Sequence, residues 1–457
     1  MKKIFYMLII LSAQVSLYAG SLDYLTNQSA KICMTFHRAA ATDASADIVN
    51  YNPAGTAFLE KGLYLDLSSQ TLFKYYSESG KEAGGEPGSL EQDEPTPVLP
   101  NFYAVYSFGS IGPVRHAVYF QAGIVAGGGT LDWKDGTIGT FAKYDESFSS
   151  LAEGVTDHSF SVSSVYYGIG AGVAYSFFKD MVSVSAGIRM VMPDRWVEMN
   201  ATSGALLSWP LLGNINLSTK YTYSAIGFTP ILGADVKPLK GLTIGTRIEF
   251  ETDLAFEYKE ESLDISPTLA VSTVEEALVE SGLYDGNKFN MNLPTIISTG
   301  AEYDMSDYLK GLTVMGSVTF YLMPSTDLGP YYDDGPAGNV NDFYDMGWEA
   351  GLGASYQLLA NLKVGAGFMY TESGAKDSYF KSPYTVINCS ANPPLDAFTM
   401  GCGATYYFPD LGLDLTVGLA WAHYIPAKTT LDFEGTAYSV EYKKDVYMLG
   451  FGVGYKL

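Results

Sequence analysis

The last eleven residues of the chain, from Tyr447 to Leu457, alternate strictly between large apolar side chains and small or polar ones. The large apolar positions are Leu449, Phe451, Val453, Tyr455 and Leu457. Successive side chains of a β-strand point to opposite faces, so this segment predicts a strand with one wholly apolar face. The same alternation recurs along the chain. It is typical of bacterial outer-membrane barrels, whose strands turn apolar side chains to lipid and small or polar ones to the lumen.

The alternation predicts an all-β transmembrane fold, namely a 14-stranded antiparallel outer-membrane β-barrel in a Gram-negative-type cell outer membrane. The expected strands are 63–76, 98–109, 114–128, 161–178, 181–198, 216–237, 240–258, 288–304, 310–323, 345–359, 361–373, 395–408, 411–426 and 438–457. Short turns alternate with long links at 77–97, 129–160, 199–215, 259–287, 324–344, 374–394 and 427–437. This asymmetry predicts short periplasmic turns opposite long extracellular loops.

The amino terminus carries an export signal. Two lysines precede an apolar run at residues 4–11, and Ala19 offers a small residue for cleavage. The run is much shorter than the ~20 residues of a membrane helix. We therefore predict that residues 1–19 are a signal peptide.

Residues 20–61 contain no period-two run, although several apolar residues are scattered through them. The segment ends on the motif Asn52-Pro53-Ala54-Gly55. A 14-stranded barrel has a lumen wide enough to need filling. We predict that residues 20–61 form a plug in that lumen, called the hatch, and that residues 62–457 form the barrel. A disordered periplasmic tail is the alternative for this segment.

Composition excludes several classes of protein. The net charge of −23 becomes −25 when Lys2 and Lys3 leave with the signal peptide, which argues against nucleic acid as a partner. No later segment is a continuous apolar span, so helical membrane insertion is excluded. The three cysteines are too scattered for a disulfide framework or a zinc site, although Cys389 and Cys402 are close enough in sequence to form one bridge. We predict no metal, cofactor or catalytic residue, and no enzyme activity.

Two loop segments are unusually apolar. One contains Leu206, Leu207, Trp209, Leu211 and Leu212, and the other, within 259–287, has apolar residues including Val274 and Leu278 at helical spacing. Contiguous apolar side chains in water usually mark a binding surface. These segments are therefore predicted to form a ligand-binding groove outside the membrane, unless they pack together merely to stiffen the loops.

Three basic residues, Arg189, Arg247 and Lys363, are assigned to the lumen side by alternation. A cation in an apolar lumen would bind the carboxylate head group of a ligand. Alternatively, each cation pairs with a lumen acid such as Glu249 or Glu251. A glycine run, Gly127-Gly128-Gly129, ends the third expected strand, where it would allow a bend or simply a flexible loop entry.

The chain resembles the FadL/TodX-type outer-membrane transporters of long-chain fatty acids and hydrocarbons. The segment from Asp47 to Ala57 is similar to the Asn-Pro-Ala segment that closes the hatch of that family. Residues 290–294 are similar to its Leu-Pro strand entry, and residues 245–250 to its Tyr-Arg-Ser-Glu strand. The tail from residue 398 onward follows its last three strands, although the family commonly ends in Phe rather than Leu.

The resemblance implies passive uptake of long-chain fatty acids or similar hydrophobic compounds, including detergent-like lipids. A ligand would be caught on an extracellular groove, pass to an apolar lumen site, and leave sideways into the bilayer after the hatch rearranges. The kink behind that exit would be Gly127–Gly129. Outer-membrane lipids and the barrel assembly machinery are the expected partners. A general diffusion porin, a surface adhesin or structural protein, and a barrel hydrolase are the alternatives.

Overall fold

The computed structural model describes residues 29–36, 39–40, 44–81, 87–112, 114–142, 154–205, 213–266, 284–331, 338–433 and 436–457. The predicted signal peptide lies outside the described residues, as do both apolar loop segments, 206–212 and 267–283. Among the residues that are described, no helix is long and apolar enough to cross a membrane.

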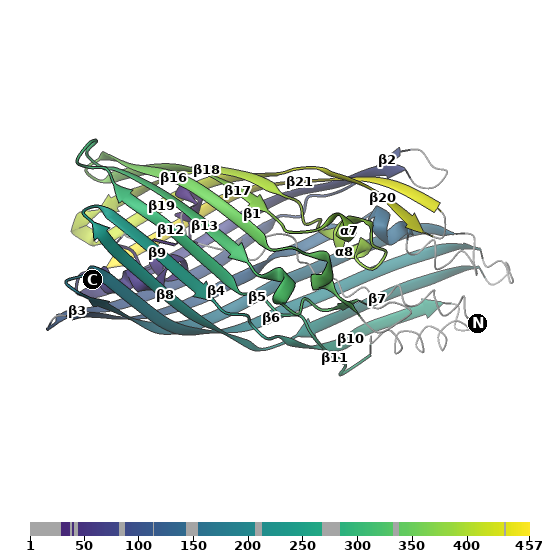
Figure 1. Cartoon of the computed structure of the whole chain (residues 1–457). Helices are drawn as coiled ribbons and strands as arrows, with labels where there is room; N and C mark the ends of the chain where they lie inside the picture. Colours follow the sequence, from purple (N-terminus) through teal and green to yellow (C-terminus); the bar gives the residue numbers. More distant parts are fainter. Residues whose placement is uncertain are drawn as a thin grey trace.

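The described strands occupy 14 positions around a closed antiparallel barrel (Figure 1). Nine positions hold one strand each: β1 (Gly62–Lys81), β4 (Val114–Trp133), β5 (Val155–Phe177), β6 (Val182–Ala205), β13 (Leu312–Tyr321), β16 (Gly347–Leu359), β17 (Leu362–Glu372), β18 (Ala397–Phe408) and β21 (Thr436–Lys456). Five positions hold two: β2 (Pro87–Gln92) with β3 (Thr96–Ile111), β7 (Asn214–Ser224) with β8 (Gly227–Leu239), β9 (Leu242–Glu249) with β10 (Ala255–Ser266), β11 (Lys288–Asn290) with β12 (Ile296–Asp304), and β19 (Leu413–Tyr424) with β20 (Ala427–Phe433). The predicted fold is confirmed.

The barrel closes where β1 pairs with β21. The register runs from Tyr64 opposite Lys456 to Lys81 opposite Ser439. Leu63 and Leu457 exchange two backbone hydrogen bonds beyond that register. Closure pairs the first and last described strands of the wall, so their backbone groups are satisfied inside lipid.

The two faces of the wall differ as the alternation predicts. On β19, the outward side chains Leu415, Val417 and Leu419 are 41–53% exposed, whereas the inward side chains Thr416 and Ala420 are buried. On β9, Ile244 is exposed and the charged Arg247 and Glu249 are buried inside. A charge on the lipid side would cost a few kcal/mol, which fixes this facing.

Three neighbouring positions, predicted as continuous strands, are interrupted at residues 225–226, 250–254 and 291–295. Pro294 has no amide hydrogen and cannot donate to a sheet ladder. Asn292 partly replaces the missing pairing, because its side chain accepts from Leu254 N at 2.9 Å and donates to Glu251 at 2.7 Å. Among the described residues, the backbone at this level of the wall forms an isolated bridge between Thr252 and Leu293, and Met291 N donates to the Leu254 carbonyl at 3.0 Å.

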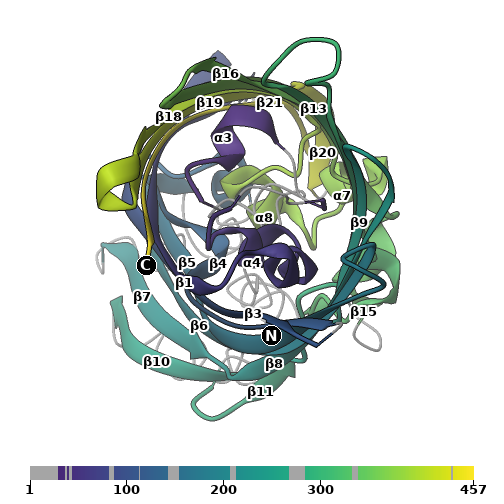
Figure 2. The same cartoon turned by 90° about the vertical axis from the view of Figure 1, so that its left-hand side faces the viewer.

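The described part of the hatch lies inside the barrel (Figure 2). It consists of α3 (Ile32–Thr35), α4 (Ile48–Tyr51) and the 3-10 helix η2 (Pro53–Phe58). Nearly all of its residues are buried, including the apolar side chains of Ile32, Phe36 and Val49. The division of the chain into signal peptide, hatch and barrel stays a prediction.

At the other end of the barrel, the extracellular links carry short elements. These are η5 (Met323–Ser325), β14 (Pro330–Tyr331), β15 (Gly338–Asn339), η6 (Val340–Phe343), α7 (Asp377–Lys381) and α8 (Val386–Ala391). The 3-10 helix η7 (Pro409–Leu411) forms a turn at the periplasmic end. All six residues of α8 are buried, and Figure 2 shows α8 within the ring of strands.

Candidate functional site

Asn52, the first residue of the hatch motif, joins the hatch to the barrel wall. Its side chain is fully buried, and Nδ2 donates to Asp235 Oδ1 and to the Ala39 carbonyl, both at 2.9 Å. The same nitrogen also reaches backbone carbonyls of β8 and β9. Oδ1 accepts from Ala54 N at 3.2 Å and so caps η2, whose first residue is Pro53. One side chain therefore starts the helix and fixes it to two strands.

A second anchor lies near the periplasmic end, where the hatch lysine Lys31 approaches two carboxylates. Its ammonium is 3.7 Å from Asp47 in the hatch and 3.8 Å from Asp414 on β19. Asp47 also accepts a hydrogen bond from Ser29 at 2.6 Å. The hatch is thus held by charge as well as by the Asn52 amide.

Glycines of the barrel wall allow α3 to approach unusually closely. A Cβ atom at Gly401 would lie 2.2 Å from the Cys33 carbonyl oxygen, and one at Gly353 would lie 2.3 Å from the Thr35 carbonyl oxygen. Any side chain at these positions would displace the hatch backbone. The inward glycines of β16, β17, β18, β19 and β21 therefore form a seat for α3.

Arg189 and Arg247, two of the predicted head-group residues, lie together inside the barrel. Both are buried and both form an ion pair with Glu249. Arg247 Nη1 also donates to the hatch carbonyl of Asn50 at 2.7 Å. The structure thus matches the alternative in which these cations pair with a lumen acid, and it adds a contact to the hatch that the sequence did not suggest.

Lys363, the third predicted head-group residue, lies apart from this pair. It faces the lumen near the periplasmic end of β17, opposite Thr405, whose hydroxyl is 3.8 Å from Met34 Sδ of the hatch. Strands β12, β13 and β16 separate β9 from β17 in the wall. The three predicted cations therefore do not form one site.

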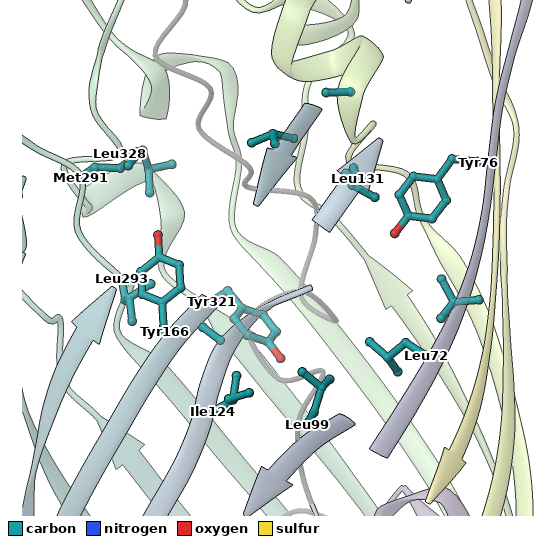
Figure 3. Close-up of a cluster of buried hydrophobic side chains, with 14 of the residues drawn as sticks. Leu72, Tyr76, Leu99, Ile124, Leu131, Tyr166, Met291, Leu293, Tyr321 and Leu328 are labelled. Atoms are coloured by element: carbon teal, nitrogen blue, oxygen red, sulfur yellow. The ribbon is translucent and has the colours of Figure 1, made fainter. Parts of the chain in front are cut away.

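An apolar cluster fills the part of the lumen between the hatch and the extracellular mouth (Figure 3). We call it the lumen cluster. Its members come from five strands and two connecting segments, and each is at most 7% exposed. They include Leu72, Tyr76, Leu99, Ile124, Leu131, Tyr166, Met291, Leu293, Tyr321 and Leu328. An apolar ligand could bind to such a surface without burying polar groups of the protein that lack hydrogen-bond partners.

The glycine run lies inside β4 rather than at a loop entry. The pairing of β4 with β5 shifts register between Ile124 and Ala126, and again between Ala126 and Gly129. Gly127 and Gly129 have φ of 87° and 78°, which other residues rarely adopt. Lys74 Nζ donates to the Gly128 carbonyl at 3.0 Å across the bulge. The role of this bulge in lateral release stays a prediction.

Two buried lysines in the upper lumen were missed by sequence reasoning. Lys74 is 2% exposed, and Lys444 on the neighbouring strand β21 is 1% exposed. Lys444 lies directly opposite Tyr76, a member of the lumen cluster. Alternation along 63–76 and 438–457 already placed both lysines on the lumen side, so this signal was present in the sequence.

Comparisons with known proteins agree with this geometry. The sequence model of the outer membrane protein transport protein family (OMPP1/FadL/TodX) matches residues 11–457. The chain belongs to this family. It is accordingly an outer-membrane protein of the FadL/TodX group, whose members transport hydrophobic compounds. A comparison with curated protein sequences finds no significant match.

Solved structures of FadL/TodX-type proteins share the fold. The crystal structure of a Pseudomonas aeruginosa FadL homologue superposes with a TM-score of 0.69 at 14% identity, covering 96% of this chain and 99% of that one. The Ralstonia pickettii toluene transporter TbuX gives a TM-score of 0.58 at 14% identity over 94% of this chain and 98% of its own. The monoaromatic hydrocarbon channel CymD gives 0.53 at 15% identity over 96% and 99%. Identities this low establish the common barrel alone.

Proposed function

We propose that this FadL/TodX-family protein takes up long-chain fatty acids, or similar hydrophobic compounds, passively across the outer membrane. The observation that carries the proposal is a barrel closed by its own hatch with an apolar cluster above it. A general diffusion porin would need an open, polar bore, and an adhesin would not need a buried hatch. The toluene and monoaromatic transporters among the similar structures show that related barrels serve smaller apolar molecules.

The expected route has three steps. A ligand binds first at the extracellular apolar loops, where Leu206, Leu207, Trp209, Leu211 and Leu212 face Val274 and Leu278 in our prediction. It next enters the lumen cluster and displaces the hatch from its contacts around Asn52. It then leaves through the wall beside Gly127–Gly129. No energy source or chemical step is required, because transfer from water to an apolar site is itself favourable.

The structure changes one detail of the predicted route. Arg189 and Arg247 already share Glu249, and Arg247 also binds the hatch. We propose that this group holds the hatch closed in place of binding a head group. A ligand that loosens Arg247 from the Asn50 carbonyl would then release the hatch.

A reversible cross-link between hatch and wall tests this proposal. An ideal Cβ atom at Gly450 lies 3.3 Å from the Ala30 Cβ atom, close to the ~3.5–4.5 Å separation found in disulfides. The triple variant Ala30→Cys, Gly450→Cys, Cys33→Ser should form this bridge in the oxidising periplasm. Uptake of a labelled long-chain fatty acid, in a host lacking its own transporter for it, should fall at least tenfold and return when a reductant is added.

The single variant Gly450→Cys in the same Cys33→Ser background is the matched control, because it carries the same added side chain without the bridge. It should transport with or without reductant. Full uptake by the oxidised, cross-linked protein would show that the hatch does not gate transport. Absence of fatty-acid uptake by the unmodified protein, with small sugars passing freely, would instead favour the porin.

A further inference from the structure

The extracellular mouth has a cover of its own, formed by residues 377–396 with α7 and α8. We call it the mouth lid. The contacts of its far end with the wall and the neighbouring loop include three hydrogen bonds. Trp133 Nε1 donates to the Ala391 carbonyl at 3.2 Å, Gly139 N donates to Ser390 Oγ at 3.1 Å, and Lys444 Nζ donates to Asn392 Oδ1 at 2.7 Å.

The Lys444 ammonium is the charged member of this contact. It lies 4.8 Å from the ring centre of Tyr76 and 4.4 Å from that of Tyr424. Both rings stabilise the cation through their negative faces but do not neutralise it. Asn392, the residue after α8, presents a neutral amide oxygen to this cation and is 7% exposed.

We propose that Lys444 is a binding site for the carboxylate of an amphiphilic ligand, and that Asn392 of the mouth lid occupies this site while the protein is closed. This inference rests on the proposed function and deepens it by naming the ligand class. Because Tyr76 belongs to the lumen cluster, an aliphatic tail in that cluster brings its head group to Lys444.

Replacement of the Asn392 amide by a ligand carboxylate at Lys444 would open the mouth lid. The hydrogen bond from Lys444 to Asn392 has one charged partner, whereas a carboxylate adds a second, opposite charge, and burial strengthens the attraction between the two charges. A carboxylate therefore competes successfully with the Asn392 amide for Lys444. Losing the Asn392 contact removes one of the hydrogen bonds that hold the far end of the lid. A neutral hydrocarbon of equal length makes no such exchange.

Two opposite substitutions at Asn392 test the exchange. Asn392→Asp places a permanent carboxylate on Lys444, and should raise the half-saturating concentration for fatty-acid uptake about tenfold or more. Asn392→Ala empties the site and should lower that concentration. A merely structural role for Asn392 predicts that both substitutions impair uptake in the same direction.

Substitution of Lys444 tests the ligand class. The readout is the ratio of uptake of a long-chain fatty acid to uptake of the alcohol of the same chain length. Lys444→Met should reduce this ratio about tenfold, and Lys444→Arg should largely restore it. Lys443→Met is the matched control, because Lys443 is the exposed neighbour on β21 and should leave the ratio unchanged. Gel mobility before and after heating checks that each barrel is folded.

Binding of the fatty acid and the alcohol to the purified variants separates this inference from the proposed function. Fatty-acid binding that is lost in Lys444→Met, in a protein that transports nothing, would support the site and reject the transport function. Uptake with an unchanged acid-to-alcohol ratio in Lys444→Met would reject the site and leave the transport function standing. Absence of both binding and uptake would reject both.

Discussion

At the scale of single residues, the side chain of Asn52 makes several different structural contacts. Its amide nitrogen donates a hydrogen bond to the barrel wall, and its amide oxygen accepts one from the first turn of η2. The short motif around it therefore makes sense physically: Asn caps the helix, and Pro53 at the first helical position needs no amide partner. An aspartate would keep the cap but would lose the donor and bring a second carboxylate toward Asp235.

We expect Asn52→Ala to make the closed protein leak. Removing a buried partner of this kind costs about 1–3 kcal/mol, which corresponds to a roughly 5- to 150-fold rise in the open fraction of the hatch. Single-channel recording should then show more frequent openings. Asn200→Ala removes a partly exposed asparagine bonded to Ser159 at 3.1 Å, and should leave the conductance as in the original protein. If neither variant opened more often than the original protein, the anchoring role of Asn52 would be contradicted.

The sequence predicted on which side of the barrel wall a residue lies, but it did not predict which other residue it contacts. Period-two alternation placed Arg189 and Arg247 in the lumen because lipid would not tolerate them. It gave no means of choosing between a ligand and Glu249, since that choice depends on how β6 and β9 stand relative to each other around the barrel. Contacts such as Lys444 with Asn392 join segments that have no pairing signal in the sequence at all.

At the scale of elements, β4 shows how a short sequence signal becomes a local distortion. The glycine run was expected at the end of a strand, whereas β4 continues to Trp133 and carries the run as a bulge. The difference arises because the apolar alternation resumes beyond the glycines with Leu131 and Trp133 on the inner face. Bulges of this kind end or redirect strand pairing near functional sites.

Substitutions within the bulge should distinguish the roles of its glycines. Gly127→Ala combines a strained positive φ with a Cβ atom 2.3 Å from the Ser164 carbonyl oxygen, so it should remodel the bulge. Gly128→Ala meets no atom within 4 Å and is the matched control. If lateral release occurs here, Gly127→Ala should slow fatty-acid uptake severalfold with binding to purified protein unchanged. Identical uptake by the two variants would place the exit elsewhere.

Elements outside the repeating pattern were the least predictable. The interrupted strands at 225–226, 250–254 and 291–295 read as continuous because their apolar period persists across the breaks. Only Pro294 signalled an interruption, and only in one of the three. The mouth lid was assigned to a long loop, since six buried residues of α8 are too few to show a helical period.

At the scale of the whole molecule, two segments lie within the ring of strands, the hatch toward the periplasm and α8 of the mouth lid toward the outside. Between them the lumen carries many buried apolar side chains, together with charged ones such as the Arg189–Glu249 ion pair and Lys444. The fold class and strand number followed from the sequence because a membrane barrel repeats one simple rule 14 times. The hatch and the mouth lid do not share this repeating pattern. Only the length and composition of residues 20–61 indicated the hatch.

Deletion of residues 20–58 tests how far the hatch alone keeps the bore shut. If the mouth lid is a second closure, the shortened protein should show small or intermittent conductance in a planar bilayer. The same deletion with Asn392→Ala should show larger and steadier openings. Large steady openings of the deletion alone would mean that the lid does not seal. Folding of both proteins can be checked by their heat-dependent gel mobility.

The hatch runs into β1 with only three residues, 59–61, between η2 and the strand. That strand forms the seam with β21, and Leu63 and Leu457 tie the seam at its periplasmic end. So short a link keeps the hatch at the rim of the barrel from the moment that β1 and β21 pair. We therefore expect insertion of the strands into the bilayer and filling of the lumen to be coupled steps of biogenesis.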